Sequence, residues 1–520
     1  MPSSTPIRRH SDAPGPLVGC LAAVLLHLPA FRYQLLSDDE AIYDAMAQVV
    51  SRGGVMYRDT VDHKPPGLVY TYAAVRSVVE HLGGGFPLVL AGVHLVGLVF
   101  VVATCWALHR IARHVLEERL WGLPPLLYAL ASAANIAPDS LAVNGEMLMA
   151  LPTVVAVWAA LVAAKEDALG RRVPLWILAG VFCGVAALYK YQAALVGLAL
   201  LVVAAKDLKT HLARAVCLAV GFAVPFASTA LYFWHRGALG DAIGWGILFN
   251  RSYLSEGPGL QMAASRLGAQ LFGVVLPSLL FFAAGFVSLW CILRRGKPPG
   301  IVAGRAMLAV WALESIYCFT LGRRFFGHYL LQPELPLALL AAGPVAAAFE
   351  ARPRLTLGAL AAPAAVFFGF NVLPELTSRV VYGDPDYWTV GRAAAERTRP
   401  GDDIWVWGNV PQIYYAAERE PGVRFTFCNY LTGLSPGTPS EYDPAVDPRA
   451  NAVTAAWDMV VADLDDRRPT LVLDTAAAGM KSYGKFPVGS FPVLARYLGT
   501  HYRIEGTVNG VVFYRRIDST

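Results

Sequence analysis

Residues 37–67 read SDDEAIYDAMAQVVSRGGVMYRDTVDHKPPG and directly follow an apolar run at residues 17–36. Asp38, Asp39 and Glu40 stand together at the end of that run. If the run crosses a bilayer, these carboxylates lie at the boundary of the hydrocarbon, where charge is costly and usually serves a function. The segment therefore predicts a functional site at the edge of a membrane.

The rest of this segment adds a fixed lysine. Residues 41–50 have the periodicity of a short amphipathic helix, and Gly53 and Gly54 are expected to end it. Lys64 precedes two prolines, which restrict the backbone that carries it. A carboxylate in this setting can take a proton from a hydroxyl, and a nearby lysine can neutralise a phosphate. Helix capping by Asp38 or Asp39 is the structural alternative for the acids.

The composition indicates a membrane protein. Of 520 residues, 56% are hydrophobic and 16% are charged, whereas soluble domains average about 45–50% and about 25%. The charges are unevenly spread, at about 13% of residues 1–378 and about 23% of residues 379–520. We therefore predict a membrane domain over residues 1–378, with a first outer loop at 37–85, and a soluble domain over residues 379–520.

Apolar runs long enough to cross a bilayer recur through the first domain. We predict about eleven transmembrane helices, near residues 17–36, 86–108, 120–134, 147–164, 173–189, 192–205, 214–234, 267–293, 302–320, 329–349 and 355–373. In the second domain, strands are expected at 404–407, 423–427 and 471–474, with a hairpin of 502–507 and 510–515 and helices between them. The expected fold class is mainly α and polytopic, with a C-terminal soluble α/β domain.

The basic residues predict the orientation of these helices, because loops rich in Lys and Arg stay in the cytoplasm. Such loops alternate along the chain and carry Arg8 and Arg9, Arg110 to Arg119, Lys165 to Arg172, Lys206 to Arg214, Arg294 to Arg305, and Arg352 and Arg354. An odd number of helices then puts residues 379–520 on the periplasmic or extracellular face of the cell's inner (cytoplasmic) membrane. One miscounted helix would reverse that assignment.

A few basic residues fall on the predicted outer face instead. They are Arg58, Lys64, Lys190, Arg251, Arg323 and Arg324. Together they favour an anionic, lipid-linked ligand such as a phosphate. Snorkelling to lipid headgroups is the simpler alternative for any one of them.

Other classes of site find little support in the sequence. The net charge of +5 is small, and no basic stripe with interleaved aromatic residues indicates nucleic acid binding. The seven cysteines form no CxxC pair, and the eleven histidines show no paired metal spacing. Asp384-Pro385-Asp386 resembles a metal-binding DxD motif, but a turn after the last apolar run explains it more simply. A divalent metal stays open as a cofactor.

The run Asp39-Glu40-x-x-Tyr43, with Tyr57-Arg58-Asp59 and Lys64-Pro65-Pro66, resembles the first periplasmic loop of GT-C glycosyltransferases. It is most similar to the glycosyltransferase family 39 branch, which includes protein O-mannosyltransferases and the lipid A aminoarabinose transferase. The resemblance implies a polyprenyl-phosphate sugar donor on the outer face. It also implies that Asp39 is the essential acid, paired with Glu40, and that Lys64 binds the donor phosphate. Asp38 is an extra acid, so the choice of base stays open.

Later segments extend the resemblance. Asn144-Gly145-Glu146 resembles the second outer acid of the family, with Asp139 as the alternative, although an acid favoured by a helix N-terminus explains Glu146 as well. Expected partners for the donor phosphate besides Lys64 are Arg58, Lys190, Arg323 and Arg324. Further candidates for the site are Tyr43, His63, His328 and Tyr329. Residues 408–415 are a candidate for facing the site and shaping acceptor choice, although a turn that packs its own aromatic residues explains them at least as well.

The sequence thus predicts an inverting glycosyltransferase that moves a monosaccharide from a polyprenyl-phosphate donor to an envelope lipid, glycan or protein. A transporter or flippase of an anionic lipid-linked substrate is the alternative, although no internal repeat supports it. Clustering of Asp39, Lys64 and Glu146 would favour the enzyme, and scattered positions the transporter. An inactive relative that acts as an assembly partner is a third hypothesis. Lys297-Pro298-Pro299-Gly300 copies the motif at Lys64 but is expected to be a cytoplasmic turn.

Overall fold

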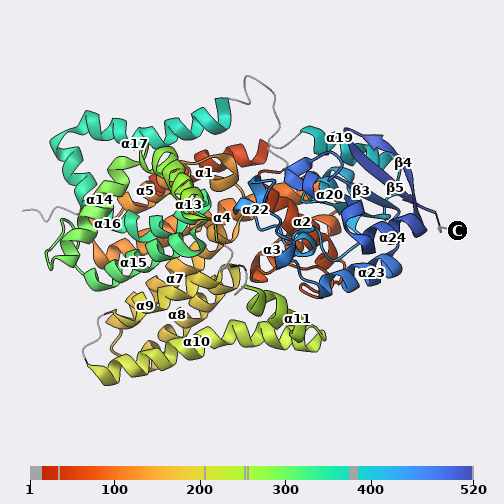
Figure 1. The fold of residues 1–520 in the computed structure, drawn as a ribbon. Coiled ribbons are helices and arrows are strands. Elements are labelled where there is room, and N and C mark those ends of the chain that lie inside the picture. Colours follow the sequence, from red (N-terminus) through yellow and green to blue (C-terminus); the bar gives the residue numbers. More distant parts are fainter. Residues whose placement is uncertain are drawn as a thin grey trace, which may run out of the picture.

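The computed structural model describes residues 15–32, 35–203, 207–250, 253, 257–373 and 385–517. Residues 15–373 form a helical body and residues 385–517 form a region built around a sheet, called the sheet region below (Figure 1). The predicted domain boundary at residues 378 and 379 lies outside the described residues, as do Arg8, Arg9 and Arg251.

Long apolar helices build most of the helical body. It contains α1 (Leu17–His27), α4 (Phe86–Val115), α5 (Leu123–Ser132), α7 (Gly145–Lys165), α8 (Leu169–Tyr189), α9 (Val196–Leu201), α10 (Leu208–His235), α13 (Leu260–Gln270), α14 (Leu279–Leu293), α15 (Arg305–Thr320), α16 (Leu331–Ala351) and α17 (Pro353–Phe367). Glycines let α8 and α10 pack closely, since a Cβ at Gly180 would lie 2.3 Å from the carbonyl oxygen of Leu218. Small residues at such crossings are typical of helices in membranes.

The predicted number of transmembrane helices is not confirmed. Within the described residues, helices long and apolar enough to cross a membrane are Phe86–Val115, Ala137–Lys165, Leu169–Tyr189, Leu208–His235 and Gly327–Ala351. A bent pair, Leu260–Val275 with Leu279–Leu293, could add one more. The other apolar runs form shorter helices. In the run at 120–134, for example, α5 begins only at Leu123, with Pro124 and Pro125 in its first turn, and has 10 residues.

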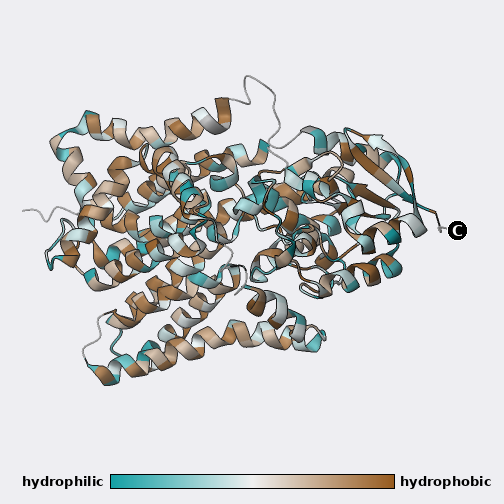
Figure 2. Ribbon diagram, in the orientation of Figure 1, coloured by the Kyte–Doolittle hydropathy of each residue, from teal (hydrophilic) through white to brown (hydrophobic). Residues whose placement is uncertain are grey.

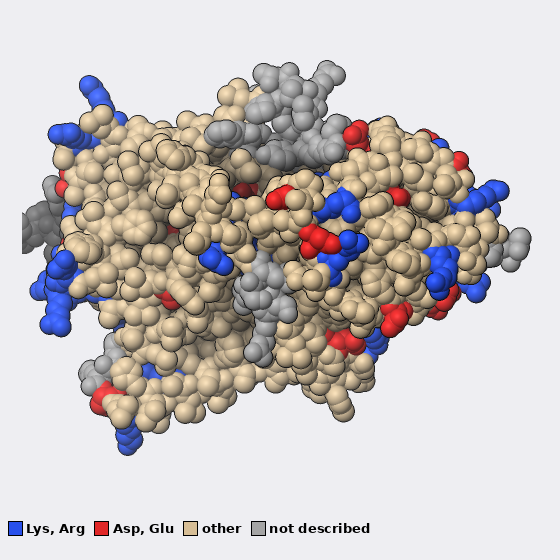
Figure 3. All heavy atoms as spheres, viewed as in Figure 1, with Lys and Arg blue, Asp and Glu red and all other residues tan. Residues whose placement is uncertain are grey.

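The surface of the helical body suits a lipid environment. Figure 2 shows hydrophobic residues along its helices, and large apolar side chains of α10 point outward, with Leu231 62% and Trp234 66% exposed. In Figure 3, Lys and Arg gather at the end of the body far from the sheet region, while the sheet region carries both signs of charge. Apolar surface of this extent marks an integral membrane protein.

The sheet region is a small α/β fold. Its strands are β1 (Asp403–Trp407), β2 (Glu420–Pro421), β3 (Leu471–Asp474), β4 (Tyr502–Val508) and β5 (Val511–Arg516), in the order β2-β1-β3-β5-β4. β1 pairs in parallel with β2 and β3, and β5 pairs antiparallel with β3 and β4. Helices α19 (Pro385–Glu396), α20 (Gln412–Ala417), α23 (Ala455–Arg467) and α24 (Pro492–His501) accompany the strands.

The prediction of a small α/β fold is confirmed, with one strand misplaced. Residues 423–427 were expected to form a strand but form a loop, and β2 lies before them at residues 420–421. Phe425 in this loop packs against Trp245 of the helical body, with ring centroids 5.9 Å apart, and the carbonyl of Arg424 accepts a hydrogen bond from the amide of Val61. These contacts with another segment outweigh the local strand propensity.

Residues 37–85, the predicted first outer loop, lie between the rest of the helical body and the sheet region. They contain α2 (Asp38–Ser51) and α3 (Gly67–His81). Arg52 forms an ion pair with Glu420, and Ala45 belongs to the core of the sheet region. The sheet region therefore braces the loop that carries the predicted site.

Candidate active site

Three adjacent acids begin α2, and the helix sends them in three directions. The hydroxyl of Ser37 caps the helix by accepting a hydrogen bond from the amide of Glu40 at 3.1 Å. The structure thus gives the capping role to Ser37 and not to Asp38 or Asp39. Successive residues of a helix differ by about 100° around its axis, so Asp38, Asp39 and Glu40 meet different neighbours.

Asp38 turns toward the sheet region. Its carboxylate accepts hydrogen bonds from Gln412 of α20 and from Lys481, whose Nζ lies 3.0 Å away. Residues 408–415 therefore contact the start of α2 through Gln412. Asp38 acts here as a contact between α2 and the sheet region.

Glu40 is turned into the protein and is fully buried. Its carboxylate accepts hydrogen bonds from the amides of Leu36 at 2.9 Å and Val143 at 2.8 Å, and it lies 3.2 Å from Nε2 of His94. The contacts tie the start of α2 to α4 and to the segment before α7. Full burial and these contacts suit a role in positioning α2, in support of the predicted base Asp39.

Glu40→Ala is expected to lower the free energy of unfolding by about 3 kcal/mol or more, because buried donors left without an acceptor cost about 1–3 kcal/mol each. Thermal melting in detergent measures this loss of stability. Asp38→Asn is the control, because the Asp38 side chain is 46% exposed. A Glu40→Ala protein that melts like the wild type would contradict the positioning role.

Asp39 faces Lys64. The lysine Nζ lies 3.1 Å from Oδ1 of Asp39 and also donates to the hydroxyl of Tyr43, one helical turn further along α2. The side chains of Asp39 and Lys64 are 38% and 23% exposed, so a ligand can reach both. The predicted pairing of an acid and a lysine within residues 37–67 is thus present in the fold.

The charged forms of Asp39 and Lys64 stabilise each other. Partial burial by itself raises the pKa of Asp39, but attraction to Lys64 and His328 outweighs it, so the pKa lies below its usual value. Burial by itself lowers the pKa of Lys64, but Asp39, Tyr43 and Asp62 raise it well above its usual value. At neutral pH, Asp39 is therefore a carboxylate and Lys64 an ammonium.

The backbone that carries Lys64 is held on both sides. Tyr57, which adopts a positive φ of 74°, donates its hydroxyl to the carbonyl of Lys64 at 2.8 Å. The side-chain amide of Asn250 donates to the carbonyl of His63 at 2.7 Å. With the two following prolines, these bonds leave the lysine little freedom other than its side chain.

Two further residues near Lys64, Asp62 and Tyr430, were not among the predicted site residues. Asp62 is buried, accepts hydrogen bonds from the amide of His63 at 2.7 Å and the hydroxyl of Tyr430 at 3.2 Å, and interacts electrostatically with Lys64. Burial by itself raises the pKa of Asp62, but Lys64 and His63 lower it below its usual value. The position of Asp62, two residues before Lys64, was a usable signal, whereas nothing local pointed to Tyr430 of the sheet region.

A second acid and lysine pair lies nearby. Nζ of Lys190, at the end of α8, lies 2.7 Å from Oε1 of Glu146, at the start of α7, and stands over the ring of Tyr329 at 4.8 Å from its centroid. Gly145 allows this approach, since a Cβ there would lie 2.9 Å from the carbonyl oxygen of Tyr189. Glu146 is buried, and the Lys190 side chain is 20% exposed.

Asp139 and His328 complete the cluster. Nδ1 of His328 lies 2.9 Å from Oδ1 of Asp139. The same oxygen also accepts a hydrogen bond from the backbone amide of His328. His328 interacts electrostatically with both Asp39 and Glu146, and Lys190 does so with Lys64. The three pairs thus form one site, here called the acid–lysine site, made of Asp39, Tyr43, Asp62, Lys64, Asp139, Glu146, Lys190, His328 and Tyr329.

The predicted arginines have other partners. Arg58 bonds Asp59 at 2.8 Å and the carbonyl of Arg236. Arg324 is buried and donates to the carbonyls of Tyr253 and Pro436, which anchors the sheet region. Arg323 is exposed. Of the predicted phosphate partners, Lys190 alone joins Lys64 among the residues described.

His63 lies next to the acid–lysine site. The His63 ring lies against that of Tyr253, with centroids 4.1 Å apart and the planes tilted by 37°, and Nδ1 lies 3.1 Å from the hydroxyl of Tyr430. His63 therefore stands beside the acid–lysine site and links it to the sheet region. Within the described ranges, no group of three or more His, Cys, Asp or Glu could hold a metal ion.

The fold has counterparts among solved structures. ArnT from Cupriavidus metallidurans bound to undecaprenyl phosphate matches with a TM-score of 0.60 and 15% identity, over 97% of this chain and 98% of that chain. In the apo state it matches over 96% and 97% with the same TM-score. The oligosaccharyltransferase of Archaeoglobus fulgidus, tethered to an acceptor peptide with the NVT sequon, matches with a TM-score of 0.54 and 12% identity, over 97% of this chain and 74% of that chain.

The similarity to these proteins is one of fold. No protein-family profile and no curated protein matches the sequence. Both counterparts are GT-C glycosyltransferases. The chain therefore has a GT-C fold, and the resemblance predicted from residues 37–67 is confirmed at that level.

Proposed function

We propose that the chain is an inverting glycosyltransferase that moves a monosaccharide from a polyprenyl-phosphate donor to an acceptor hydroxyl on the outer face of the inner membrane. The observation that carries this proposal is the reachable pair of Asp39 and Lys64, 3.1 Å apart, with the pair of Glu146 and Lys190 beside it. Two lysines fit a phosphate, and a carboxylate beside them fits the acceptor hydroxyl.

The reaction uses these groups in complementary ways. The acceptor oxygen attacks the anomeric carbon from the face opposite the lipid phosphate, and the bond from that carbon to the phosphate oxygen breaks. Asp39 takes the proton of the acceptor hydroxyl, and the bonding electrons leave with the polyprenyl phosphate. Lys64 and Lys190 stabilise the negative charge that grows on the departing phosphate.

The ion pair links donor binding to the strength of the base. Without donor, Lys64 holds the pKa of Asp39 low, which makes the carboxylate a weak base. A phosphate that draws Lys64 toward itself removes part of this attraction, and the pKa of Asp39 then rises. Donor binding thus makes Asp39 a stronger base, and Asp39 remains a weak base while no donor is bound.

The arrangement supports the enzyme over the transporter. Clustering of Asp39, Lys64 and Glu146 was the feature expected of the enzyme, and electrostatic interactions through His328 and Lys190 join these residues. A transporter needs no base beside its phosphate-binding cations. The acceptor in this proposal is an envelope lipid, glycan or exported protein.

A strain that lacks the gene tests the proposal directly. Mass spectrometry of its lipid A, envelope glycans and exported proteins is expected to show one class that has lost the mass of a sugar, and the wild-type gene should restore it. If every surface class is unchanged under conditions in which the wild-type chain is expressed, the proposed transfer reaction is wrong.

A further inference from the structure

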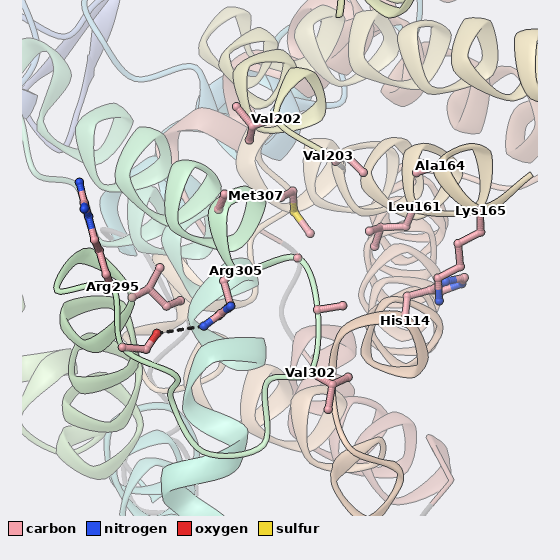
Figure 4. Close-up of a pocket in the computed structure, with 15 residues that line it drawn as sticks. His114, Leu161, Ala164, Lys165, Val202, Val203, Arg295, Val302, Arg305 and Met307 are labelled. Atoms are coloured by element: carbon pink, nitrogen blue, oxygen red, sulfur yellow. Dashed lines mark hydrogen bonds between the residues drawn. The ribbon is translucent and has the colours of Figure 1, made fainter. Parts of the chain in front are cut away.

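A separate cavity of about 620 Å³ lies at the opposite end of the helical body from the acid–lysine site. Helix α7 begins beside Glu146 and ends at Lys165, which lines the cavity. Its 21 residues, at about 1.5 Å each, separate the two places by about 30 Å. The ends of α4, α7 and α14 and the start of α15 surround the cavity (Figure 4).

The charge of this cavity has one sign. The charged residues of its lining are Lys165, Arg295 and Arg305, with the imidazole of His114 beside them, and none of the described lining residues is acidic. Arg305 donates to the carbonyl of Gly296 at 3.2 Å, and Nδ1 of His114 is buried without a hydrogen-bond partner. Lys165 and Arg295 are exposed and make no ion pair within the described part of the chain. The described lining thus presents three cations and no carboxylate.

The remaining lining is mostly apolar. Leu161, Val202, Ile292 and Met307 contribute hydrocarbon surface next to the basic groups. In addition, α15 begins at this cavity with Gly304 as its cap residue and no side chain capping its first amides. Amides at a helix start are donors for an anion. An occupant that matches both surfaces has a phosphate joined to hydrocarbon chains.

We propose that this cavity binds the phosphate headgroup of an anionic glycerophospholipid, with its acyl chains against the apolar wall. Basic pockets between membrane helices are suited to such headgroups. Setting the topology of the chain explains basic residues in this loop, but it does not require a cavity. Arg294, next to Arg295 in the sequence, is not part of the cavity lining and packs over the ring of Trp290 instead. Free phosphate would leave the apolar wall unused.

Two charge-matched variants of the full chain test the proposal. The first replaces the cavity cations, as Lys165→Gln with Arg295→Gln and Arg305→Gln. The control removes three cations that do not line the cavity, as Arg294→Gln with Lys297→Gln and Arg354→Gln. Both lose the same charge from the same predicted side of the membrane. Native mass spectrometry of delipidated protein, titrated with phosphatidylglycerol or phosphatidylcholine, measures lipid binding.

We expect the wild type and the control to retain one phosphatidylglycerol with high affinity, and the cavity variant to lose roughly a hundredfold in affinity, since three basic contacts are removed. Phosphatidylcholine should bind much more weakly to all three. Equal binding of the two lipids, or equal loss in the control, would overturn the proposal. So would displacement of phosphatidylglycerol by millimolar inorganic phosphate, which would identify a free phosphate site.

A second variant keeps the test decisive if the triple substitution does not fold. Ala306→Trp places a bulky side chain at an exposed lining position of α15 without changing the charge. It is expected to weaken phosphatidylglycerol binding at least about tenfold, since it removes space for the lipid. Unchanged binding in a folded Ala306→Trp protein would contradict occupation of the cavity. Because this site is remote from Asp39, its failure leaves the proposed transfer reaction untouched.

Discussion

Asp39→Asn is expected to reduce kcat for sugar transfer by at least about a hundredfold, since a positioned general base contributes about 10²–10⁴-fold. The amide cannot accept the proton of the acceptor. It also cannot hold Lys64 by charge, so the lysine becomes more available to the donor phosphate. Affinity for undecaprenyl phosphate, used as the probe, should therefore stay the same or increase. The combination of lost turnover and retained lipid binding is the signature of a base.

Asp38→Asn is the matched control for this variant. The two acids are neighbours in the first turn of α2, but Asp38 bonds Gln412 and Lys481 of the sheet region. Its substitution should change kcat by less than about threefold, because exposed charge pairs contribute little. Purified, folded Asp39→Asn that turns over like the wild type would refute Asp39 as the base. A large loss in Asp38→Asn instead would move the assignment to Asp38.

Lys64→Gln is expected to weaken the binding of undecaprenyl phosphate by about ten- to a hundredfold, since hydrogen bonds to charged groups contribute about 1.5–3 kcal/mol. Turnover should fall as well, because charge on the departing phosphate loses its main partner. The two variants thus differ in lipid binding, which Asp39→Asn is expected to retain and Lys64→Gln to weaken. Retention of native lipid affinity by Lys64→Gln would contradict the phosphate role of this lysine.

The chain supplies its own control for Lys64. Lys297 stands in the same sequence, Lys-Pro-Pro-Gly, but in an exposed turn between α14 and α15. Lys297→Gln removes the same charge from the same local motif and should leave transfer and undecaprenyl phosphate binding unchanged. Equal losses in the two variants would mean that general charge, and not the site, determines the affinity for the anionic lipid.

Much of the architecture could be predicted from local sequence. Apolar runs became helices, and the alternation after residue 385 became a small sheet with helices, because hydrophobic periodicity is a property of neighbouring residues. The predicted number of transmembrane helices is not confirmed, since runs such as residues 120–134 form helices shorter than a bilayer-spanning length. Residues 423–427 show the same limit, because contacts with Val61 and Trp245 hold a strand-like sequence as a loop.

The sequence by itself identified residues 37–67 as a candidate site, since carboxylates and a proline-fixed lysine beside an apolar run are visible without a structure. Only the tertiary structure decided which acid faces the lysine. Asp38, Asp39 and Glu40 are neighbours in sequence, but the helix rotates them toward Lys481, Lys64 and His94. Tyr430 is out of reach of any local pattern, because it reaches Asp62 from 368 residues away. Pairing between distant charges depends on how helices and sheet pack, which spacing along the chain does not encode.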